Sequence, residues 1–253
     1  MRQNQRIIRR EGVYRVIRLN APAGSIVNPR PPAAVGSRNP TAMILADVLF
    51  RALGQAAPAR AIAASGNMQG TILAGWDALR GRYFVNYENF AGGQGALPMR
   101  DGDDAMHVSM SNTSNLPIEA MEMEFPLRAE RYELIPDSGG VGRQRGGLGA
   151  CRDYRIIGDG VVLATRSTRQ RFAAQGLDGG GSGALGSFIL DPDTPQAMKL
   201  PGTGSEIALN NGTLLRIMTA GGGGYGDVSK RDRDQIAADH RSAKTSKRSI
   251  ENV

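Results

Sequence analysis

The residues of this chain that could carry acid–base or metal chemistry gather around His107. The chain has only two histidines, and His107 leads an alternating run toward Asn112 and Thr113. An acidic cluster (DGDD, 101–104) precedes it and Glu119 follows. An imidazole can act as a general base near neutral pH, and carboxylates beside it can hold Mg²⁺ or Mn²⁺. Because the spacing matches no ligand motif, a structural histidine and a solvated acidic turn stay open as alternatives.

Two glycine-rich segments raise the question of a phosphate site. They read GGVGRQRGG at 139–147 and GGGGYGD at 221–227. Glycine N–H groups can cradle phosphate at a helix N-terminus. The first segment lacks the G-x-x-x-x-G-K-[ST] form, and no helix follows the second that could receive a pyrophosphate. Arg143 and Arg145 could still clamp an anion or carboxylate, and structural glycine turns are the alternative.

Nucleophilic chemistry has less support in the sequence. Cys151 is the only cysteine, which excludes an internal disulfide framework and a cysteine-based zinc site. It stands in an alternating segment, so we expect a buried structural thiol in a strand. No G-x-S-x-G elbow is present, so a Ser-His-Asp triad is not supported.

Composition and charge narrow the classes of partner. The 253 residues are 40% hydrophobic, enough for a sizeable core in one or two domains. The net charge of +7 sits largely at the two ends, while aromatic residues make up only 5%. Without stacking aromatics or a nucleic-acid module, we expect no nucleic-acid partner. No apolar stretch approaches the ~18 residues of a membrane span, so we expect a cytoplasmic protein without a membrane partner.

One segment has the pattern of a strong amphipathic helix. Thr41–Ala57 begins after Pro40 and stops before Pro58. Its apolar residues recur at helical spacing and form one stripe. We therefore expect a core helix whose buried face consists of Leu45, Val48, Leu49, Ala52 and Leu53.

Many short alternating segments predict strands. We expect hairpins from three pairs of segments: Thr71–Trp76 with Tyr83–Phe90, Ala150–Ile157 with Val161–Arg166 across GDG, and Glu206–Leu209 with Thr213–Thr219 across NNG. Further strands are Gly12–Asn20, Leu127–Ile135 and Ser187–Leu190, and short or weak helices are Ile118–Met123 and Asp232–Ala243. We expect loops at 63–70, 91–95 and 176–186. The pattern predicts an α+β fold, β-rich with many short strands and Gly-rich loops and one strong amphipathic helix.

Taken in order, several motifs identify a family resemblance. They are GSIVNPRPPAAVGSRNPT (24–41), ASGNMQG (64–70), ENFAGGQGA (88–96), HVSMSNTSNLPIEAME (107–122), FPLRAERYELIPDSGGVGRQRGGLG (125–149) and GGGGYGD (221–227). This set resembles the C-terminal half of hydantoinase B-type subunits of the ATP-dependent hydantoinase/oxoprolinase family. We therefore expect a hydantoinase B-like region over 1–230, in one or two packed subdomains, and a basic polar tail over 231–253.

The resemblance implies a component of an ATP-dependent multisubunit amidohydrolase acting on a cyclic amide of the hydantoin or 5-oxoproline type. In this family a carbonyl oxygen is phosphorylated by a hydantoinase A-type kinase-fold subunit, which binds ATP and Mg²⁺. The N-terminal half of hydantoinase B, where a divalent metal such as Mn or Zn is expected, would come from another chain. This implies a hetero-oligomer. The alternatives are a subunit of an acetone- or acetophenone-type ketone carboxylase and a non-catalytic assembly module.

The resemblance also suggests site residues. We expect His107 and Glu119 to be catalytic and Asn112 and Thr113 to bind the small-molecule substrate. A second group, expected to hold the adjoining substrate loop, is Arg131, Asp137 and Arg143. No metal ligand can be assigned to this chain.

Overall fold

The structure is a computed structural model that describes residues 20–246. It divides into two compact units, one ending at Ser37 and one beginning at Arg38. Within 20–37, the backbone makes an isolated antiparallel bridge between Ser25 and Asn28. Apart from Asn20, the strand predicted at Gly12–Asn20 lies outside the described residues. No helix in the described part is long and apolar enough to cross a membrane.

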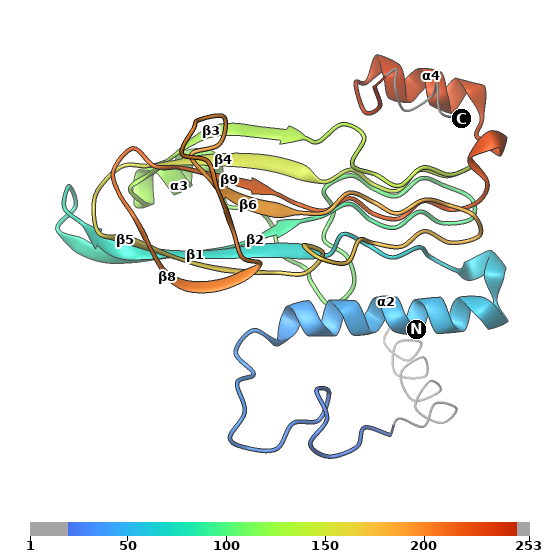
Figure 1. Cartoon of the computed structure of the whole chain (residues 1–253), viewed down its shortest axis with the longest axis horizontal. Coiled ribbons are helices and arrows are strands. Elements are labelled where there is room, and N and C mark those ends of the chain that lie inside the picture. The colour runs from blue at the N-terminus through green and yellow to red at the C-terminus, as the bar shows by residue number, and fades with distance from the viewer. Residues whose placement is uncertain (1–19, 247–253) are drawn as a thin grey trace, which may run out of the picture. The chain divides into compact units, whose positions relative to one another are not determined.

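Two antiparallel sheets form the second unit, which confirms the β-rich α+β prediction. The first sheet has the order β2-β1-β5-β8, with β1 at Met68–Asp77, β2 at Arg82–Ala91, β5 at Val161–Ser167 and β8 at Thr203–Leu209. The second has the order β3-β4-β9-β6-β7, with β3 at Leu127–Leu134, β4 at Ala150–Ile156, β9 at Leu214–Met218, β6 at Ser187–Leu190 and β7 at Met198–Leu200. The sheets form two layers (Figure 1). Apolar side chains of both meet in one core that includes Leu73, Leu163, Phe188 and Leu215.

Only one of the three predicted hairpins is present. β1 and β2 pair over their whole length, from Met68↔Ala91 to Asp77↔Arg82. The other two predictions are wrong, because β4 and β5 lie in different sheets, and so do β8 and β9. Both glycine turns reverse the chain at a corner between the sheets. The two corners hold each other: Asn211 N donates to Asp159 Oδ1 at 3.0 Å, and Gly158 N donates to Asn211 Oδ1 at 3.1 Å.

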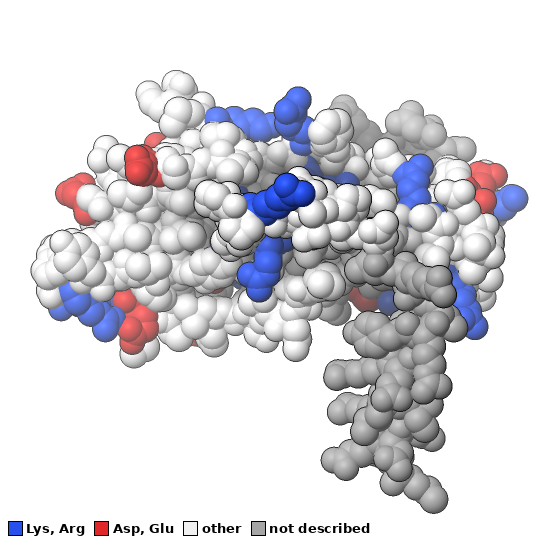
Figure 2. Space-filling model, turned by 90° about the horizontal axis from the view of Figure 1, so that it is seen from below, with Lys and Arg blue, Asp and Glu red and all other residues white. Residues whose placement is uncertain are grey.

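Helix α2 spans Arg38–Ala56 and is followed by the 3-10 turn η1 at Pro58–Arg60. It begins three residues before the predicted start, because Pro40 fits inside the first turn. The predicted burial of its apolar stripe is wrong: Met43 is the buried residue of the helix, whereas Val48 is 57% and Leu53 63% exposed. The spacing of the stripe defines one helix face but cannot say which face meets the protein. From below, the surface is uncharged over most of its area (Figure 2).

Two further helices complete the described chain. Helix α3, Ile118–Glu124, matches the short helix predicted there, although Pro117 stands before its first residue. Helix α4, Arg233–Arg241, follows the 3-10 turn η2 at Val228–Lys230 and matches the predicted weak helix. The Asp232 carboxylate caps α4 by accepting from the N–H groups of Asp234 and Gln235. The division into a 1–230 region and a tail stays a prediction.

The glycine-rich segments pack into a bundle of extended chains, not the flexible loops expected for 63–70 and 91–95. We call it the glycine bundle; its segments are 63–67, 92–96, 138–149, 174–183 and 219–225. They run side by side beyond the ends of the strands (Figure 1). Gly147 N donates to the Gln94 carbonyl at 2.8 Å, and Gly222 N donates to the Gly147 carbonyl at 2.9 Å. Backbones this close leave no room for side chains, since a Cβ on Gly93 would lie 1.8 Å from the Gly147 carbonyl oxygen.

Candidate functional site

His107 lies in the connection between β2 and α3 and is half-buried. Its Nε2 is 3.3 Å from the Asn89 carbonyl oxygen of β2, and its Nδ1 is 3.2 Å from Ser111 Oγ. A carbonyl oxygen can only accept, so Nε2 must carry the ring hydrogen in this bond. Burial lowers the pKa of His107, against the opposing effect of the Asn89 bond. The ring is therefore neutral near pH 7, and its Nδ1 accepts a hydrogen bond from the Ser111 hydroxyl.

A chain of hydroxyl groups connects this imidazole to the surface. Ser111 Oγ is 3.3 Å from Thr113 Oγ1, and Thr113 is exposed. We call His107, Ser111 and Thr113 the hydroxyl relay. A neutral imidazole whose lone pair faces a hydroxyl is the arrangement of a general base. The relay brings together two of the predicted residues, whereas Ser111 was missed, although it stands four residues after the histidine in the same polar run.

The other two residues predicted around His107 are exposed. Asn112 lies between the two hydroxyl residues, and Glu119 stands in the first turn of α3. Within residues 20–246, no hydrogen bond or ion pair joins Glu119 to His107. The catalytic role of Glu119 therefore stays a prediction that the geometry does not yet support.

The three residues predicted to hold a substrate loop bind their own surroundings instead. Arg131, on β3, forms ion pairs with Asp153 at 3.5 Å and Glu133 at 3.4 Å. Asp137 Oδ1 accepts from Ser246 N at 2.9 Å, and Arg143 donates to the Pro98 carbonyl at 2.8 Å. In the described part of the chain, no three His, Cys, Asp or Glu residues come together as a metal site.

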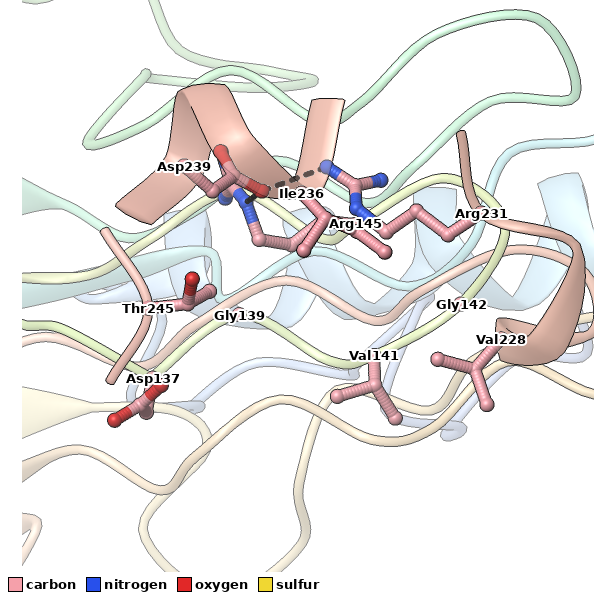
Figure 3. A pocket seen from close by; sticks show the side chains of 10 residues that line it. All are labelled: Asp137, Gly139, Val141, Gly142, Arg145, Val228, Arg231, Ile236, Asp239 and Thr245. Carbon is pink, nitrogen blue, oxygen red and sulfur yellow. Dashed lines mark hydrogen bonds and ion pairs between the residues drawn. The ribbon is translucent and has the colours of Figure 1, made fainter. Parts of the chain in front are cut away.

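The loop that holds Asp137 forms one wall of a hollow of about 590 Å³ beneath α4 (Figure 3). Val141, Val228 and Ile236 give it apolar walls, and Arg145, Arg231 and Asp239 meet beside them. Asp239 accepts from Arg145 Nε at 3.2 Å and from Arg231 Nη2 at 2.7 Å. Both guanidinium groups are therefore paired with a carboxylate of the chain itself.

The acidic cluster at 101–104 belongs to the same charge network. Arg231 pairs with Asp101 at 2.7 Å, and Asp104 pairs with Arg145 at 3.1 Å and with Lys244 at 2.7 Å. Burial alone would raise the pKa of Asp101, but hydrogen bonds from Arg231 hold it below the usual value. These pairs contradict two expectations: Asp101 and Asp104 are not a solvated turn, and Arg145 is not a free clamp for an outside anion.

A buried charged cluster beside the relay went unnoticed in the sequence. Glu88 Oε2 accepts from the Tyr154 hydroxyl at 2.9 Å, and Arg152 Nη1 lies 3.4 Å from Glu88 Oε1. The Arg152 guanidinium lies over the ring of Tyr132, 3.9 Å from its centre. Burial raises the pKa of Glu88, against the effects of Tyr154 and Arg152. Glu88 precedes Asn89, the residue that orients His107, so this cluster supports the strand that holds the imidazole.

Cys151 behaves as expected of a structural thiol. It is buried in β4, and burial, with the Asp153 charge, raises its pKa to about 11. The thiol is thus protonated at neutral pH and a poor nucleophile.

The lowered pKa of His107 gives a direct prediction. The two histidine ring signals in a proton NMR spectrum can be assigned with a His240→Asn variant, and we expect the His107 signal to titrate below about 6.5, the ordinary value. Because the folded pKa is lowered, the unfolded chain binds more protons between the two values. The contribution of His107 to stability is therefore full above about pH 6.5 and is lost as the pH falls through the lowered pKa. A midpoint at or above 6.5 would contradict the buried, neutral ring.

Comparison with known proteins places this chain and its fold in a family. Residues 3–228 match the family described as hydantoinase B/oxoprolinase. The chain belongs to the hydantoinase B/oxoprolinase family. An uncharacterized protein of Methanocaldococcus jannaschii is 38% identical to it over 237 residues, which make up 93% of this chain and 40% of that relative.

Two solved structures share the fold of this hydantoinase B/oxoprolinase chain. The ATP-dependent caprolactamase of Pseudomonas jessenii matches 93% of it with a TM-score of 0.75 and 25% identity. A nucleotide-free acetone carboxylase matches 79% with a TM-score of 0.63 and 19% identity, which shows likeness of fold. The chain spans 42% and 32% of those two chains. The family resemblance read from the motifs is thereby confirmed.

Proposed function

We propose that this chain is a component of an ATP-dependent, cytoplasmic complex that hydrolyses a cyclic amide of the hydantoin or 5-oxoproline type. The observation that carries the proposal is the match to the ATP-dependent caprolactamase over 93% of the chain, within a family described as hydantoinase B/oxoprolinase. The chain spans 42% of that caprolactamase chain. In this proposal its partners are a chain that supplies the N-terminal half and a hydantoinase A-type kinase-fold subunit that binds ATP and Mg²⁺.

The chemistry explains why such a complex would use ATP. Resonance in an amide makes the carbonyl carbon a poor electrophile, and phosphorylation of the carbonyl oxygen makes it a better one. A water molecule that attacks this carbon must lose a proton. The hydroxyl relay can receive that proton at Thr113 and pass it through Ser111 to Nδ1 of His107. In this proposal Asn112, next to the relay, faces the substrate, and a divalent metal belongs to the N-terminal half.

The test is purification of the assembled complex from its source through a tag on this chain. We expect phosphate release from ATP only when a hydantoin, 5-oxoproline or caprolactam is present, with one amide opened per phosphate. Phosphate release that instead requires a ketone and bicarbonate would favour the carboxylase alternative, for which the acetone carboxylase fold is the supporting observation. A complex that turns over neither a cyclic amide nor a ketone would favour the remaining alternative, a non-catalytic assembly module.

The role of the relay is tested in the same assay. We expect His107→Gln to lower kcat at least about tenfold, because general-base contributions are typically 10² or more. The acidic limb of the pH profile should disappear in this variant, which a purely structural role would not cause. The matched control is His240→Gln, a change of the other histidine. Equal effects of the two substitutions would remove His107 from the mechanism.

A further inference from the structure

A second hollow, separate from the relay, lies between helix α2 and the segment that follows β5. We call it the basic groove; it is an open hollow with a volume of about 690 Å³. Its lining consists of Ile44, residues 167–172, Lys199 and residues 201–203. Three of these residues are cationic, namely Arg169, Arg171 and Lys199, and none is an aspartate or glutamate. A groove lined by one sign of charge attracts ligands of the other sign.

Arg169 fixes the wall of the basic groove and does not serve as its free charge. It has a φ of 59°, which is unusual for a residue with a side chain. Its guanidinium donates to the Ser65 carbonyl at 3.0 Å and pairs with the half-buried Asp47 of α2. These contacts hold Arg169 in this conformation, and residues held in sparsely populated backbone conformations cluster at functional sites. The exposed cations Arg171 and Lys199 remain available to a ligand.

Two buried polar atoms of this wall lack a partner among the described residues. They are Thr168 Oγ1 and Gln170 Nε2. Both can donate a hydrogen bond, and a buried donor left unsatisfied costs roughly 1–3 kcal/mol. A ligand that brings acceptor oxygens would satisfy them. Gly202 packs closely against this wall: its carbonyl accepts from Ser167 Oγ at 3.1 Å, and a Cβ there would lie 2.9 Å from Ser167 Oγ and 3.2 Å from the Gln170 amide.

An exposed aromatic ring extends the basic groove. Phe172 is 76% exposed, directly after the exposed Arg171. The ring offers an apolar surface to the organic part of a ligand whose oxygens face the cations and donors.

We propose that the basic groove binds a small molecule that carries a phosphoryl group. Lys199 and Arg171 neutralise its charge, Thr168 Oγ1 and Gln170 Nε2 donate to its oxygens, and Phe172 covers its organic part. A phosphorylated amide is one such molecule, and only this last identification rests on the proposed function.

The test is a titration of the full 253-residue chain at low salt, followed by calorimetry or NMR, with three probes. Phenyl phosphate represents a phosphorylated small molecule, inorganic phosphate the free ion, and ADP a nucleotide. We expect saturable binding, with phenyl phosphate bound more tightly than inorganic phosphate or ADP. Added salt should weaken the binding, because it screens the charges of the cations. Tighter binding of ADP than of phenyl phosphate would overturn the assignment to a phosphorylated small molecule. Absence of saturable binding by all three would overturn the site itself.

Substitutions on the groove surface locate the site. Lys199→Ala is expected to weaken phenyl phosphate binding about fivefold to tenfold. Thr168→Val, which keeps the shape and removes the hydroxyl, should weaken it severalfold. The matched control is Lys230→Ala, an exposed lysine of η2 outside the groove. Circular dichroism verifies that each variant is folded, and equal affinity of the Lys199 and Lys230 variants would place the binding elsewhere.

The two proposals can fail independently. If the chain binds phenyl phosphate in the basic groove while the purified complex opens no cyclic amide, the site stands and the proposed function falls. If the complex opens the amide but no phosphate probe binds the chain, the function stands and the site falls. The same holds if a probe binds but Lys199→Ala does not weaken its binding.

Discussion

Gly93→Ala is expected to destabilise the fold by at least about 4 kcal/mol, a large part of the roughly 5–15 kcal/mol by which a typical domain is stable. The added Cβ would lie 1.8 Å from the Gly147 carbonyl oxygen and 2.8 Å from Gly222 N. Both are backbone atoms inside the glycine bundle, so no side-chain rotation can relieve the clash. Urea unfolding followed by circular dichroism measures the effect.

The matched control is Gly36→Ala, where an added Cβ meets no atom within 4 Å and φ is not positive. We expect this change to stay within about 0.5 kcal/mol. Gly222→Ala is a second test, because its Cβ would lie 2.0 Å from the Gln94 carbonyl oxygen on another segment of the bundle. If Gly93→Ala were as mild as the Gly36 control, the bundle could not be as closely packed as the structure shows.

The glycine bundle also shows what a single sequence hides. Each of its segments, read alone, has the composition of a loop, and 91–95 was interpreted that way. What makes glycine necessary at Gly93 is the backbone of a segment more than fifty residues away. No local pattern encodes that contact. The clustering of glycine in several separate segments is the signal in the sequence that fits such close backbone contacts.

Strand positions were predictable, whereas two of the pairings were not. Alternation places β4, β5 and β9 within one or two residues of their observed bounds. The turn residues at 158–160 and 210–212 correctly indicated chain reversals. A turn does not determine whether the returning strand joins the same sheet or crosses to the other. In this chain both cross, because strands of the two sheets share one core.

The candidate site was predictable only where its residues are close in sequence. His107 and Thr113 lie in one short run, and the structure links them through Ser111. Arg131, Asp137 and Arg143 were grouped through the family resemblance, and in the structure they contact separate parts of the fold. The buried pair of Glu88 and Arg152 was missed, because the two residues lie 64 positions apart and no local pattern joins them.

That buried pair gives the second large effect. Arg152 is only 3% exposed, and Arg152→Met would leave the Glu88 carboxylate buried without its cation. Removing one member of a buried ion pair typically costs about 3–5 kcal/mol, and we expect a loss of that size in urea unfolding. The double variant Glu88→Gln/Arg152→Met removes both charges and should recover most of the loss. The matched control on the same strand is Arg155→Met, whose partly exposed pair with Glu130 contributes at most about 1 kcal/mol.

The pH dependence separates a lost charge pair from lost packing. Burial already raises the pKa of Glu88, and removal of Arg152 takes away a group that lowers it. A carboxyl with a raised folded pKa binds more protons in the folded state than in the unfolded one, so stability rises as the pH falls through that pKa. The deficit of Arg152→Met should therefore be smaller at pH 5 than at pH 8. The loss of stability in Arg152→Met could instead be independent of pH, or no larger than the loss in Arg155→Met. Either result would mean that Arg152 acts through packing and that the Glu88 carboxylate does not need the positive charge of Arg152.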